Sequence, residues 1–113
     1  MNSATETRPW GSFVTFVKNE PCTVKLIYVN KGESLSLQYH LKRQEFWRVI
    51  QGNPELLIGE DAHNPTVGDE FVVAPAIHHR IAAPVDDVVI LEISTGEFDE
   101  DDIVRVEDKY GRV

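Results

Sequence analysis

The fold of this chain is decided by residues 32–52, which read GESLSLQYHLKRQEFWRVIQG. In the predicted strand Ser34–Leu41, every second side chain points to the same face of the strand. One face carries apolar side chains, and the other carries Ser36, Gln38 and His40. A short basic turn separates this strand from a second predicted strand, Glu45–Ile50. The stretch therefore predicts two neighbouring strands with a polar face that can carry chemistry.

That polar face holds candidate metal ligands. Gln38 and His40 lie two positions apart on one strand, Glu45 follows the turn, and a histidine pair, His78 and His79, comes from a predicted strand far along the chain. The two histidines of the pair are adjacent, so they face opposite sides of their strand and only one can be a ligand. Two imidazoles, a carboxylate and an amide oxygen would bind one divalent ion and leave solvent positions open, as a catalytic metal needs.

Length and composition narrow the class of protein. A chain of 113 residues suits one domain, spanning residues 1–113, with a single core. No apolar run reaches about 18 residues and no signal-peptide pattern is present, so we expect a soluble, cytoplasmic protein. The single cysteine, Cys22, excludes an internal disulfide and a cysteine-rich metal cluster, and we interpret it as a small core or edge residue. The net charge of −8 argues against nucleic acid and anionic membranes as partners, and an anionic substrate would need a local basic pocket.

Short alternating runs between glycine and proline turns predict an all-β fold, either a sandwich or a barrel. Strong turn signals occur at Gln51-Gly52-Asn53-Pro54 and at Val67-Gly68-Asp69, and Glu60–Pro65 is predicted to be a loop. A short C-terminal helix is credible only where Asp99–Asp102 precede Ile103, because acidic residues suit a helix start; a solvated acidic turn is the alternative. The predicted strands are Ser12–Val17, Thr23–Asn30, Ser34–Leu41, Glu45–Ile50, Glu55–Ile58, Glu70–Ala74, Ile77–Ala82 and Val88–Ser94.

The spacing of the candidate ligands resembles a known motif. Gly32, five residues, Gln38-x-His40, four residues, Glu45, six residues and Gly52 resemble the first motif of the cupin superfamily, with glutamine in place of the first histidine.

Gly68 through Pro75 to His79 resembles the second cupin motif, with two departures. The spacing after Gly68 is one residue longer, and the glycine that usually follows Pro-x is missing before Ile77. We therefore expect the turn at Pro75-Ala76 to have a different shape.

The cupin resemblance implies a single double-stranded β-helix, the jelly-roll barrel of that superfamily. It favours His79 over His78, which completes a ligand set of Gln38, His40, Glu45 and His79. Zinc is the expected ion, with manganese, iron, cobalt or nickel as alternatives. Because a barrel of short strands leaves edges that a second copy often covers, we also expect a homodimer.

A narrower resemblance covers nearly the whole chain. The metal motif and both ends look like type II mannose-6-phosphate isomerases, a module that is often the C-terminal part of a longer enzyme with a mannose-1-phosphate guanylyltransferase domain. That family commonly has histidines near Leu41 and Lys42 and at Phe46, and their loss is expected to change the rim of the pocket. The residues that carry the resemblance are Arg8-Pro9-Trp10-Gly11-Ser12, Ser36-Leu37-Gln38-x-His40-x-x-Arg43-x-Glu45-x-Trp47, His79-Arg80 and Glu100-Asp101-Asp102-Ile103-Val104-Arg105-x-Glu107-Asp108-x-Tyr110-Gly111-Arg112.

This resemblance implies the interconversion of mannose 6-phosphate and fructose 6-phosphate, or of a close sugar phosphate, as a small-molecule substrate. The reaction moves a proton between C2 and C1 through an enediol with negative charge on oxygen. A divalent ion would stabilise that charge as a Lewis acid. Glu92 is the candidate base because it shares a polar face with Ser94; an ordinary charged edge residue is the equal alternative.

Arginines at motif positions would bind the phosphate, because a guanidinium group matches phosphate oxygens in a bidentate way. Each of them could instead be an ordinary surface charge. Trp47 is expected in the core, His63 in a solvated loop, and His78 either exposed or packed. Besides Glu92, the residues predicted to act on the substrate are Arg105 and Arg112 in catalysis, and Arg8, Trp10, Arg43, Arg80 and Tyr110 in substrate binding.

Two rival functions stay open at this point. One is a non-catalytic sugar-binding or regulatory module, which the missing family histidines favour slightly. The other is an iron-dependent dioxygenase, against which the two terminal signatures count.

Overall fold

The structure is a computed structural model that describes residues 4–97, 99 and 101–111. Within these ranges the chain forms strands, turns and loops and no helix, so the all-β prediction is confirmed. The alternative of a helix after Asp99 is wrong, because Asp101 lies in a turn and the chain then enters a strand. The strands are β1 Ala4–Arg8, β2 Gly11–Thr15, β3 Cys22–Val29, β4 Leu37–Tyr39, β5 Arg43–Gln51, β6 Glu55–Ile58, β7 Asp61–His63, β8 Glu70–Val73, β9 His79–Ala82, β10 Val88–Gly96 and β11 Val104–Glu107.

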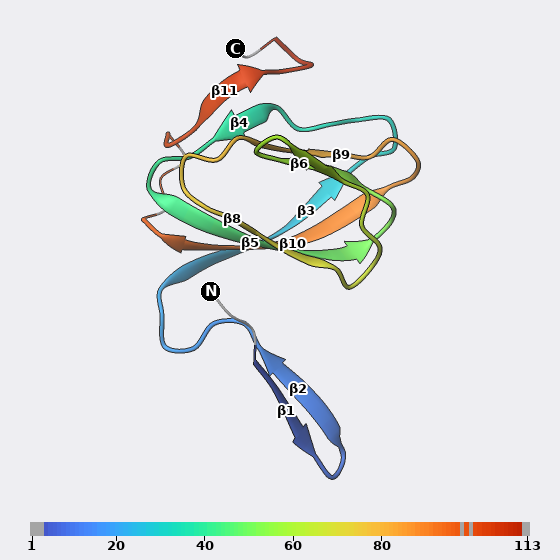
Figure 1. Cartoon of the computed structure of the whole chain (residues 1–113), viewed down its shortest axis with the longest axis vertical. Helices are drawn as coiled ribbons and strands as arrows, with labels where there is room; N and C mark the ends of the chain where they lie inside the picture. The colour runs from blue at the N-terminus through green and yellow to red at the C-terminus, as the bar shows by residue number, and fades with distance from the viewer. Residues whose placement is uncertain (1–3, 98, 100, 112–113) are drawn as a thin grey trace.

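Two antiparallel sheets form the body of the protein. One has the order β3-β10-β5-β8 and the other the order β11-β4-β9-β6-β7. Figure 1 shows them one above the other, with β3, β5, β8 and β10 in the lower layer. In each sheet the neighbours come from distant parts of the chain, since β10 pairs with both β3 and β5. This order brings β3 and β10, which are far apart in the sequence, into the same sheet as β5.

The apolar core fills one part of the space between the sheets. Alternate residues of each strand point into this space, as the period of a strand requires. Trp47 of β5 and Ile90 of β10 come from the first sheet, and Leu56 of β6 and Ile81 of β9 from the second; each is at most 1% exposed. The core cluster is completed by Val29, Val49, Val73, Ala83 and Val88.

The polar face of β4 also points into the body. Ser36 and His40 are buried, whereas Leu41 on the other parity is exposed. Leu37 and Tyr39, on the same parity as Leu41, are half-buried. The interior of the barrel is therefore apolar in one part and polar in the other, and the polar part is where the candidate ligands meet.

The predicted turn at Gly52 is confirmed, since β5 ends at Gln51 and β6 begins at Glu55. Gly52 has a φ of 87°, and a Cβ added there would lie 2.2 Å from the carbonyl oxygen of Asp87. Glycine is required both by the conformation and by the close approach of the two backbones.

Three strands differ from the prediction. β7 lies within the predicted loop Glu60–Pro65, and β1 and β11 were not expected at all. Each of these strands is short and has a neighbouring strand on one side only. The alternation of apolar and polar residues in its sequence is therefore too weak to predict a strand.

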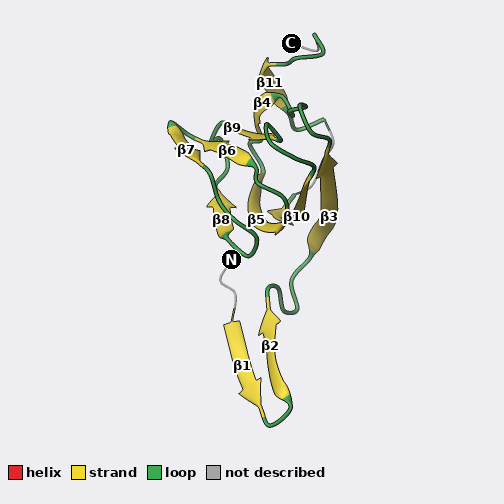
Figure 2. Ribbon diagram, turned by 90° about the vertical axis from the view of Figure 1, so that its right-hand side faces the viewer, coloured by secondary structure: helices red, strands yellow, loops and turns green. Residues whose placement is uncertain are grey.

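The N-terminal hairpin of β1 and β2 stands apart from the body. Figure 2 shows it projecting away from the two sheets, and among the described residues its strands pair only with each other. The principal extents of 52 × 32 × 22 Å and the radius of gyration of 14.7 Å reflect this projection, since a compact chain of this length has a radius of about 13 Å. Among the described residues, no helix is long and apolar enough to cross a membrane.

Candidate metal centre

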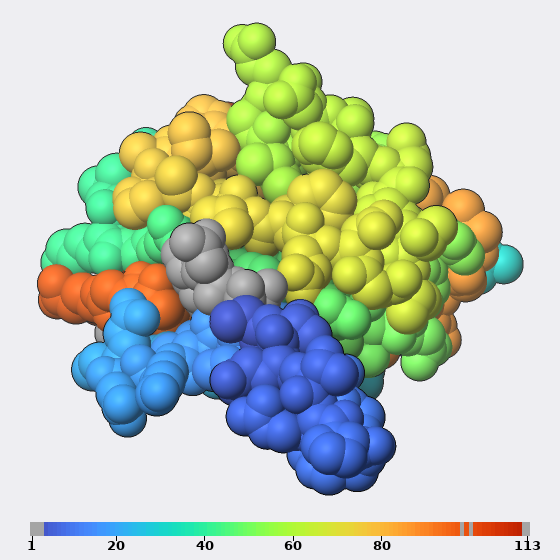
Figure 3. Space-filling view, turned by 60° about the horizontal axis from the view of Figure 1, so that its bottom comes forward, coloured from blue at the N-terminus to red at the C-terminus, as the bar shows by residue number. Residues whose placement is uncertain are grey.

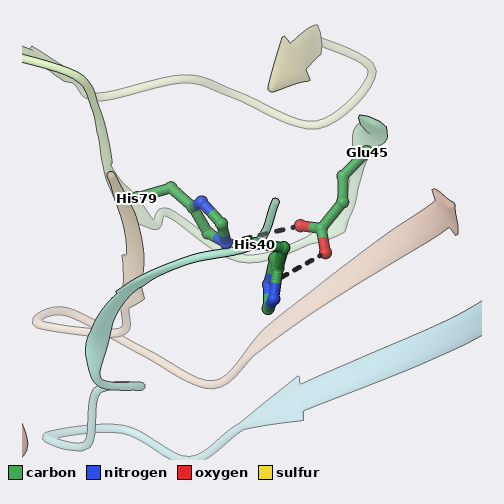
Figure 4. A group of neighbouring side chains, drawn as sticks. All are labelled: His40, Glu45 and His79. Carbon is green, nitrogen blue, oxygen red and sulfur yellow. Dashed lines mark ion pairs between the residues drawn. The ribbon is translucent and has the colours of Figure 1, made fainter. Parts of the chain in front are cut away.

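Three of the four predicted ligands meet inside the barrel. Figure 4 shows the imidazoles of His40 and His79 beside the two oxygens of the Glu45 carboxylate. His40 Nε2 lies 3.4 Å from Glu45 Oε2, and His79 Nε2 lies 3.5 Å from Glu45 Oε1. All three side chains are buried, and their candidate ligand atoms lie within 4.8 Å of one another.

The hydrogen-bond network prepares both histidines as ligands. His40 Nδ1 lies 2.6 Å from the carbonyl oxygen of Asp102, and His79 Nδ1 lies 2.9 Å from that of Ile77. A carbonyl only accepts, so in each ring Nδ1 carries the proton and Nε2 presents a lone pair. A backbone carbonyl behind the ring is a usual partner of a metal-binding histidine.

These residues fit a divalent ion. His79 Nε2 is buried and has no hydrogen-bond partner among the described residues, which is rare for a polar atom inside a protein. Two ligands of a tetrahedral ion, each about 2.1 Å from the metal, lie about 3.4 Å apart. The two Nε2–Oε separations match this spacing. The buried His-Glu-His group can therefore bind a metal, and the identity of the ion stays a prediction.

Gln38, the fourth predicted ligand, lines the same cavity as His40 and Glu45. It pairs with His79 across β4 and β9, so the two side chains leave neighbouring backbones. The buried hydroxyl of Ser36 donates to Gln38 Oε1 over 2.6 Å, which fixes the amide orientation. Its amide oxygen stays a predicted ligand.

Arg43 balances the charge of Glu45. Arg43 Nε donates to Glu45 Oε2 over 3.2 Å, and Arg43 Nη2 donates to His40 Nε2 over 3.0 Å. Trp47 Nε1 donates to the other carboxylate oxygen over 3.2 Å. A buried carboxylate needs such partners, because its ionised form is costly in a low-dielectric interior. Arg43 therefore lies directly at the predicted metal site.

A cavity of about 240 Å³ opens onto these ligands. Glu92 lies in its wall, as its shared face with Ser94 predicted, and the Ser94 hydroxyl donates to Glu92 Oε1 over 3.4 Å. Burial first, and then the negative charge of Glu45, raise the pKa of Glu92 to about 7. Burial also lowers the pKa of His79 below its usual value. The cavity is lined by Lys25, Ile27, Leu35, Gln38, His40, Arg43, Glu45, Glu92, Ile103 and Arg105.

Three cationic side chains share this cavity although the chain as a whole is strongly acidic. Arg43 lies beside the ligands, Lys25 comes from β3 and Arg105 from β11. Arg105 Nε is buried without a hydrogen-bond partner among the described residues. The cavity thus combines metal ligands, a carboxyl group with a raised pKa and a donor that can bind an anion.

The remaining predicted substrate residues lie elsewhere in this structure. Arg80 follows His79 and faces the other side of β9, where its guanidinium lies 3.6 Å from the Glu107 carboxylate. The Tyr110 hydroxyl donates to the Glu33 carboxylate, and this bond and Lys109 lower the pKa of Glu33.

Arg8 and Trp10 belong to the projecting hairpin, where they contact the Phe13 ring. Arg112 lies outside the described residues. The binding roles predicted for these residues remain predictions.

The expectation about the missing family histidines needs correction. Leu41 and Lys42 are exposed, and Phe46 packs on the outer side of its sheet against Phe16, with ring centroids 5.3 Å apart. None of the three is among the residues that line the cavity. Histidines at these positions would therefore not form the wall of this pocket.

Other expectations are settled by packing. Trp47 is a core residue, as predicted, and His78 packs against the Tyr39 ring at 4.8 Å. His63 is not simply solvated, because it lies in β7 with its ring 5.0 Å from that of Phe71. Cys22 is an exposed residue on the edge strand β3.

Sequence reasoning missed two residues of the site. Lys25 lines the cavity, and its parity with Ile27 in an alternating strand was the available signal. Asp102 holds the turn after β4, because its carboxylate accepts from the backbone N–H groups of Leu41 and Lys42, both over 2.9 Å, while its carbonyl orients His40. These N–H donors lower the pKa of Asp102. The acidic run Asp99–Asp102 does not by itself indicate that Asp102 contacts the turn after β4.

Comparison with known families accounts for this arrangement. Residues 2–108 match the family model described as mannose-6-phosphate isomerase C-terminal. The chain belongs to this family. Among curated relatives of the family, the xanthan biosynthesis protein XanB of Xanthomonas campestris pv. campestris is 36% identical over 107 residues, covering 93% of this chain and 23% of XanB.

The alginate biosynthesis protein AlgA of Pseudomonas aeruginosa is also 36% identical, covering 93% of this chain and 22% of AlgA. Mannose-1-phosphate guanylyltransferase 2 of Escherichia coli O157:H7 is 31% identical, covering 91% of this chain and 22% of that protein. This member of the isomerase C-terminal family thus spans less than a quarter of the length of the curated relatives that it matches.

Solved structures confirm the cupin fold. A double-stranded β-helix protein of Klebsiella pneumoniae superposes with a TM-score of 0.68 over 81% of this chain and 80% of that one, at 16% identity. The DMSP lyase DddQ of Ruegeria pomeroyi superposes with a TM-score of 0.69 over 96% of this chain and 52% of that one, also at 16% identity. At such identities the likeness concerns the fold alone.

Proposed function

We propose that this protein is a metal-dependent aldose–ketose isomerase that interconverts mannose 6-phosphate and fructose 6-phosphate, or a close pair of hexose phosphates. The observation that carries the proposal is one cavity lined by two members of the His-Glu-His group, His40 and Glu45, together with Glu92 and Arg105. Arg105 Nε has no hydrogen-bond partner among the described residues. Membership of the isomerase C-terminal family supports it. Because hexose phosphates are metabolites of the cell interior, we place the reaction in the cytoplasm.

His40, Glu45 and His79 would hold the divalent ion, with the Gln38 amide oxygen as a fourth ligand. A bound ion supplies Lewis-acid stabilisation of the negative charge that develops on the sugar oxygens. We expect zinc, because imidazole and carboxylate ligands at this spacing suit it, with manganese, iron, cobalt or nickel as alternatives.

Glu92 would move the proton between C2 and C1. Its carboxyl group faces the ligands, and its raised pKa of about 7 lies near the pH at which a general base works best. A single carboxylate that takes the proton from C2 and returns it to C1, while the hydroxyl proton passes from O2 to O1, balances the reaction, because the substrate and the product are isomers.

Arg105, assisted by Lys25, would bind the phosphate. A phosphate oxygen would supply the acceptor that Arg105 Nε lacks, and both side chains approach the cavity from strands other than those that carry the three ligands. Binding the phosphate at the far end of the sugar would use its binding energy to orient C1 and C2.

A coupled isomerase assay across several sugar phosphates, with the protein loaded with zinc, tests the proposal. We expect turnover of mannose 6-phosphate or a close relative, and its loss in His40→Ala together with loss of bound metal in elemental analysis. Tight binding of a hexose phosphate without turnover by metal-loaded protein would instead support a non-catalytic sugar-binding module. Oxygen consumption would support the dioxygenase.

A further inference from the structure

Asp102, far along the chain, makes three hydrogen bonds around one candidate metal ligand. Its carboxylate accepts from the backbone N–H groups of Leu41 and Lys42, and its carbonyl oxygen accepts from His40 Nδ1 over 2.6 Å. The side chain of Asp102 therefore holds the backbone that follows His40, while its main chain holds the imidazole ring. The acceptor behind this ring comes from a residue 62 positions away in the sequence.

The strand that follows Asp102 carries the donor proposed for the phosphate. Among the described residues β11 pairs with β4 alone, with Val104 opposite Tyr39 and Arg105 opposite Gln38. The Arg105 side chain lines the cavity, and its buried Nε has no hydrogen-bond partner in the described part of the chain. Residues 102–105 thus contact the strand of the metal ligands and also supply the anion donor.

This segment buries little apolar surface. Figure 1 shows β11 as the outermost strand of its sheet, beside β4. Val104 and Val106 on its outer face are each 42% exposed. A segment with few buried apolar contacts opens locally at a low cost in free energy. A ligand that binds only when the segment is docked therefore shifts the population toward the docked form.

The turn that Asp102 holds has a second attachment. The Glu97 N–H donates to the Lys42 carbonyl oxygen over 3.2 Å, so the end of β10 also bonds to this turn. Figure 3 shows the turn, in blue-green, against the dark-orange end of β10. The bonds from the turn to the Asp102 carboxylate are exposed, so water can replace this acceptor. Removing the carboxylate should therefore loosen residues 102–105 and leave the barrel folded.

From these contacts we infer that Asp102 is a positioning residue that couples the two ends of the cavity, so that an anion at Arg105 and a metal ion at the histidines each strengthen the binding of the other. An anion on Arg105 Nε keeps residues 102–105 docked, with the Asp102 carbonyl behind His40. Metal binding at His40 favours the same docked segment. By linkage the two effects are equal in size. The inference rests on the metal site and on the anion-binding role of Arg105 in the proposed function, and not on turnover.

Zinc titration against a chromophoric chelator, with and without sulfate, tests this coupling. Sulfate is a tetrahedral dianion that resembles phosphate, and chloride at equal ionic strength is the reference. We expect sulfate to tighten zinc binding by about 5-fold or more in the unaltered protein. Asp102→Ala should weaken zinc binding by about 10–100-fold, as expected for a residue that orients a ligand. This variant and Arg105→Ala should both lose the effect of sulfate.

Two further variants control for charge and for folding. Asp101→Ala removes the same charge from the exposed neighbour and should keep both the zinc affinity and the sulfate effect. Asp102→Asn keeps one acceptor oxygen for the turn, so its zinc affinity should lie between those of Asp102→Ala and the unaltered protein. Circular dichroism should be the same for all of these proteins.

Zinc binding as tight in Asp102→Ala as in the unaltered protein would overturn the inference. A sulfate effect that persists in this variant would also overturn it, since sulfate would then act by touching the metal. If Asp102→Ala does not fold, an undiminished sulfate effect in Asp102→Asn decides in the same way. Coupling without isomerase turnover would support the inference and count against the proposed function, whereas turnover without coupling would do the reverse.

Discussion

At the residue scale, two buried glutamates face one cavity in different surroundings. Glu45 accepts hydrogen bonds from Arg43 and Trp47, which suit its ionised form. Burial and the charge of Glu45 instead raise the pKa of Glu92 to about 7. Two carboxyl groups in such different surroundings suit two roles. Glu45 thus suits a ligand and Glu92 proton transfer.

This division of roles predicts the behaviour of Glu92→Gln. The amide keeps the size of the side chain but cannot take up a proton, so kcat should fall by about 10²–10⁴-fold. Metal content, measured by elemental analysis, should not change, because Glu92 is not among the three ligands. A variant that keeps its kcat, or that loses its metal, would contradict the role of Glu92 as the base.

Arg105 and Arg80 provide a matched pair for the phosphate site. Arg105 reaches the cavity, whereas Arg80 lies on the other side of the sheet beside Glu107. Arg105→Ala should lower kcat/KM at a cost of roughly 2–5 kcal/mol, because a buried phosphate loses its charged partner. Arg80→Ala should leave kcat/KM nearly unchanged. Steady-state kinetics of the two variants would contradict this assignment if the larger loss occurred in Arg80→Ala.

At the element scale, the turn between β8 and β9 explains how the second motif tolerates its missing glycine. Ala76 has a φ of 67°, a left-handed conformation that glycine adopts without strain. Its N–H donates to the His40 carbonyl oxygen over 2.6 Å. The turn therefore holds β9 beside the metal site, at the cost of backbone strain.

Ala76→Gly should accordingly stabilise the fold. Relief of the left-handed strain contributes about 1–2 kcal/mol, and the greater freedom of glycine in the unfolded chain offsets about 0.4–1 kcal/mol of it. Urea unfolding should show a higher free energy of unfolding, by up to about 1.6 kcal/mol. The control is Ala62→Gly in β7, where φ is not positive and the same change should destabilise. If Ala76→Gly and Ala62→Gly destabilised the fold equally, the conclusion that Ala76 is strained would be wrong.

The elements also show what sequence could predict. Alternation located β3, β5, β8, β9 and β10, and the ligand spacing found the three side chains that meet. Arg80 is adjacent to His79 in the sequence, so its side chain points to the opposite face of β9. The prediction that it binds substrate came from its position in the motif and did not use this alternation. Asp102 could not be predicted, because its role depends on long-range contact with the turn after β4. The position of the hairpin was equally unpredictable, because alternation does not say what a strand packs against.

At the scale of the whole molecule, a fold built around buried histidines should be sensitive to acid. Burial lowers the pKa of His79 below 6.5, so below that pH the unfolded chain binds a proton that folded, metal-free protein refuses. The contribution of His79 to stability is therefore fully present above pH 6.5 and falls as the pH drops toward its folded pKa, whereas the raised pKa of Glu92 contributes with the opposite sign over the same range. Thermal unfolding from pH 8 to 5 measures this, and His79→Gln should flatten the slope. Because Glu92 is present in both proteins, the difference between them isolates His79, and an identical pH dependence of the two would contradict the prediction.

The central claim joins the metal site, the base and the anion-binding end of one cavity in a single reaction. Exchange of the C2 hydrogen of mannose 6-phosphate with deuterated solvent, followed by NMR, tests it most directly, because it reports proton transfer even without net conversion. The zinc-loaded protein should incorporate solvent deuterium at C2, lose this exchange after chelation and regain it when zinc is restored. Metal-loaded protein that binds mannose 6-phosphate yet neither incorporates deuterium nor forms fructose 6-phosphate would contradict the claim.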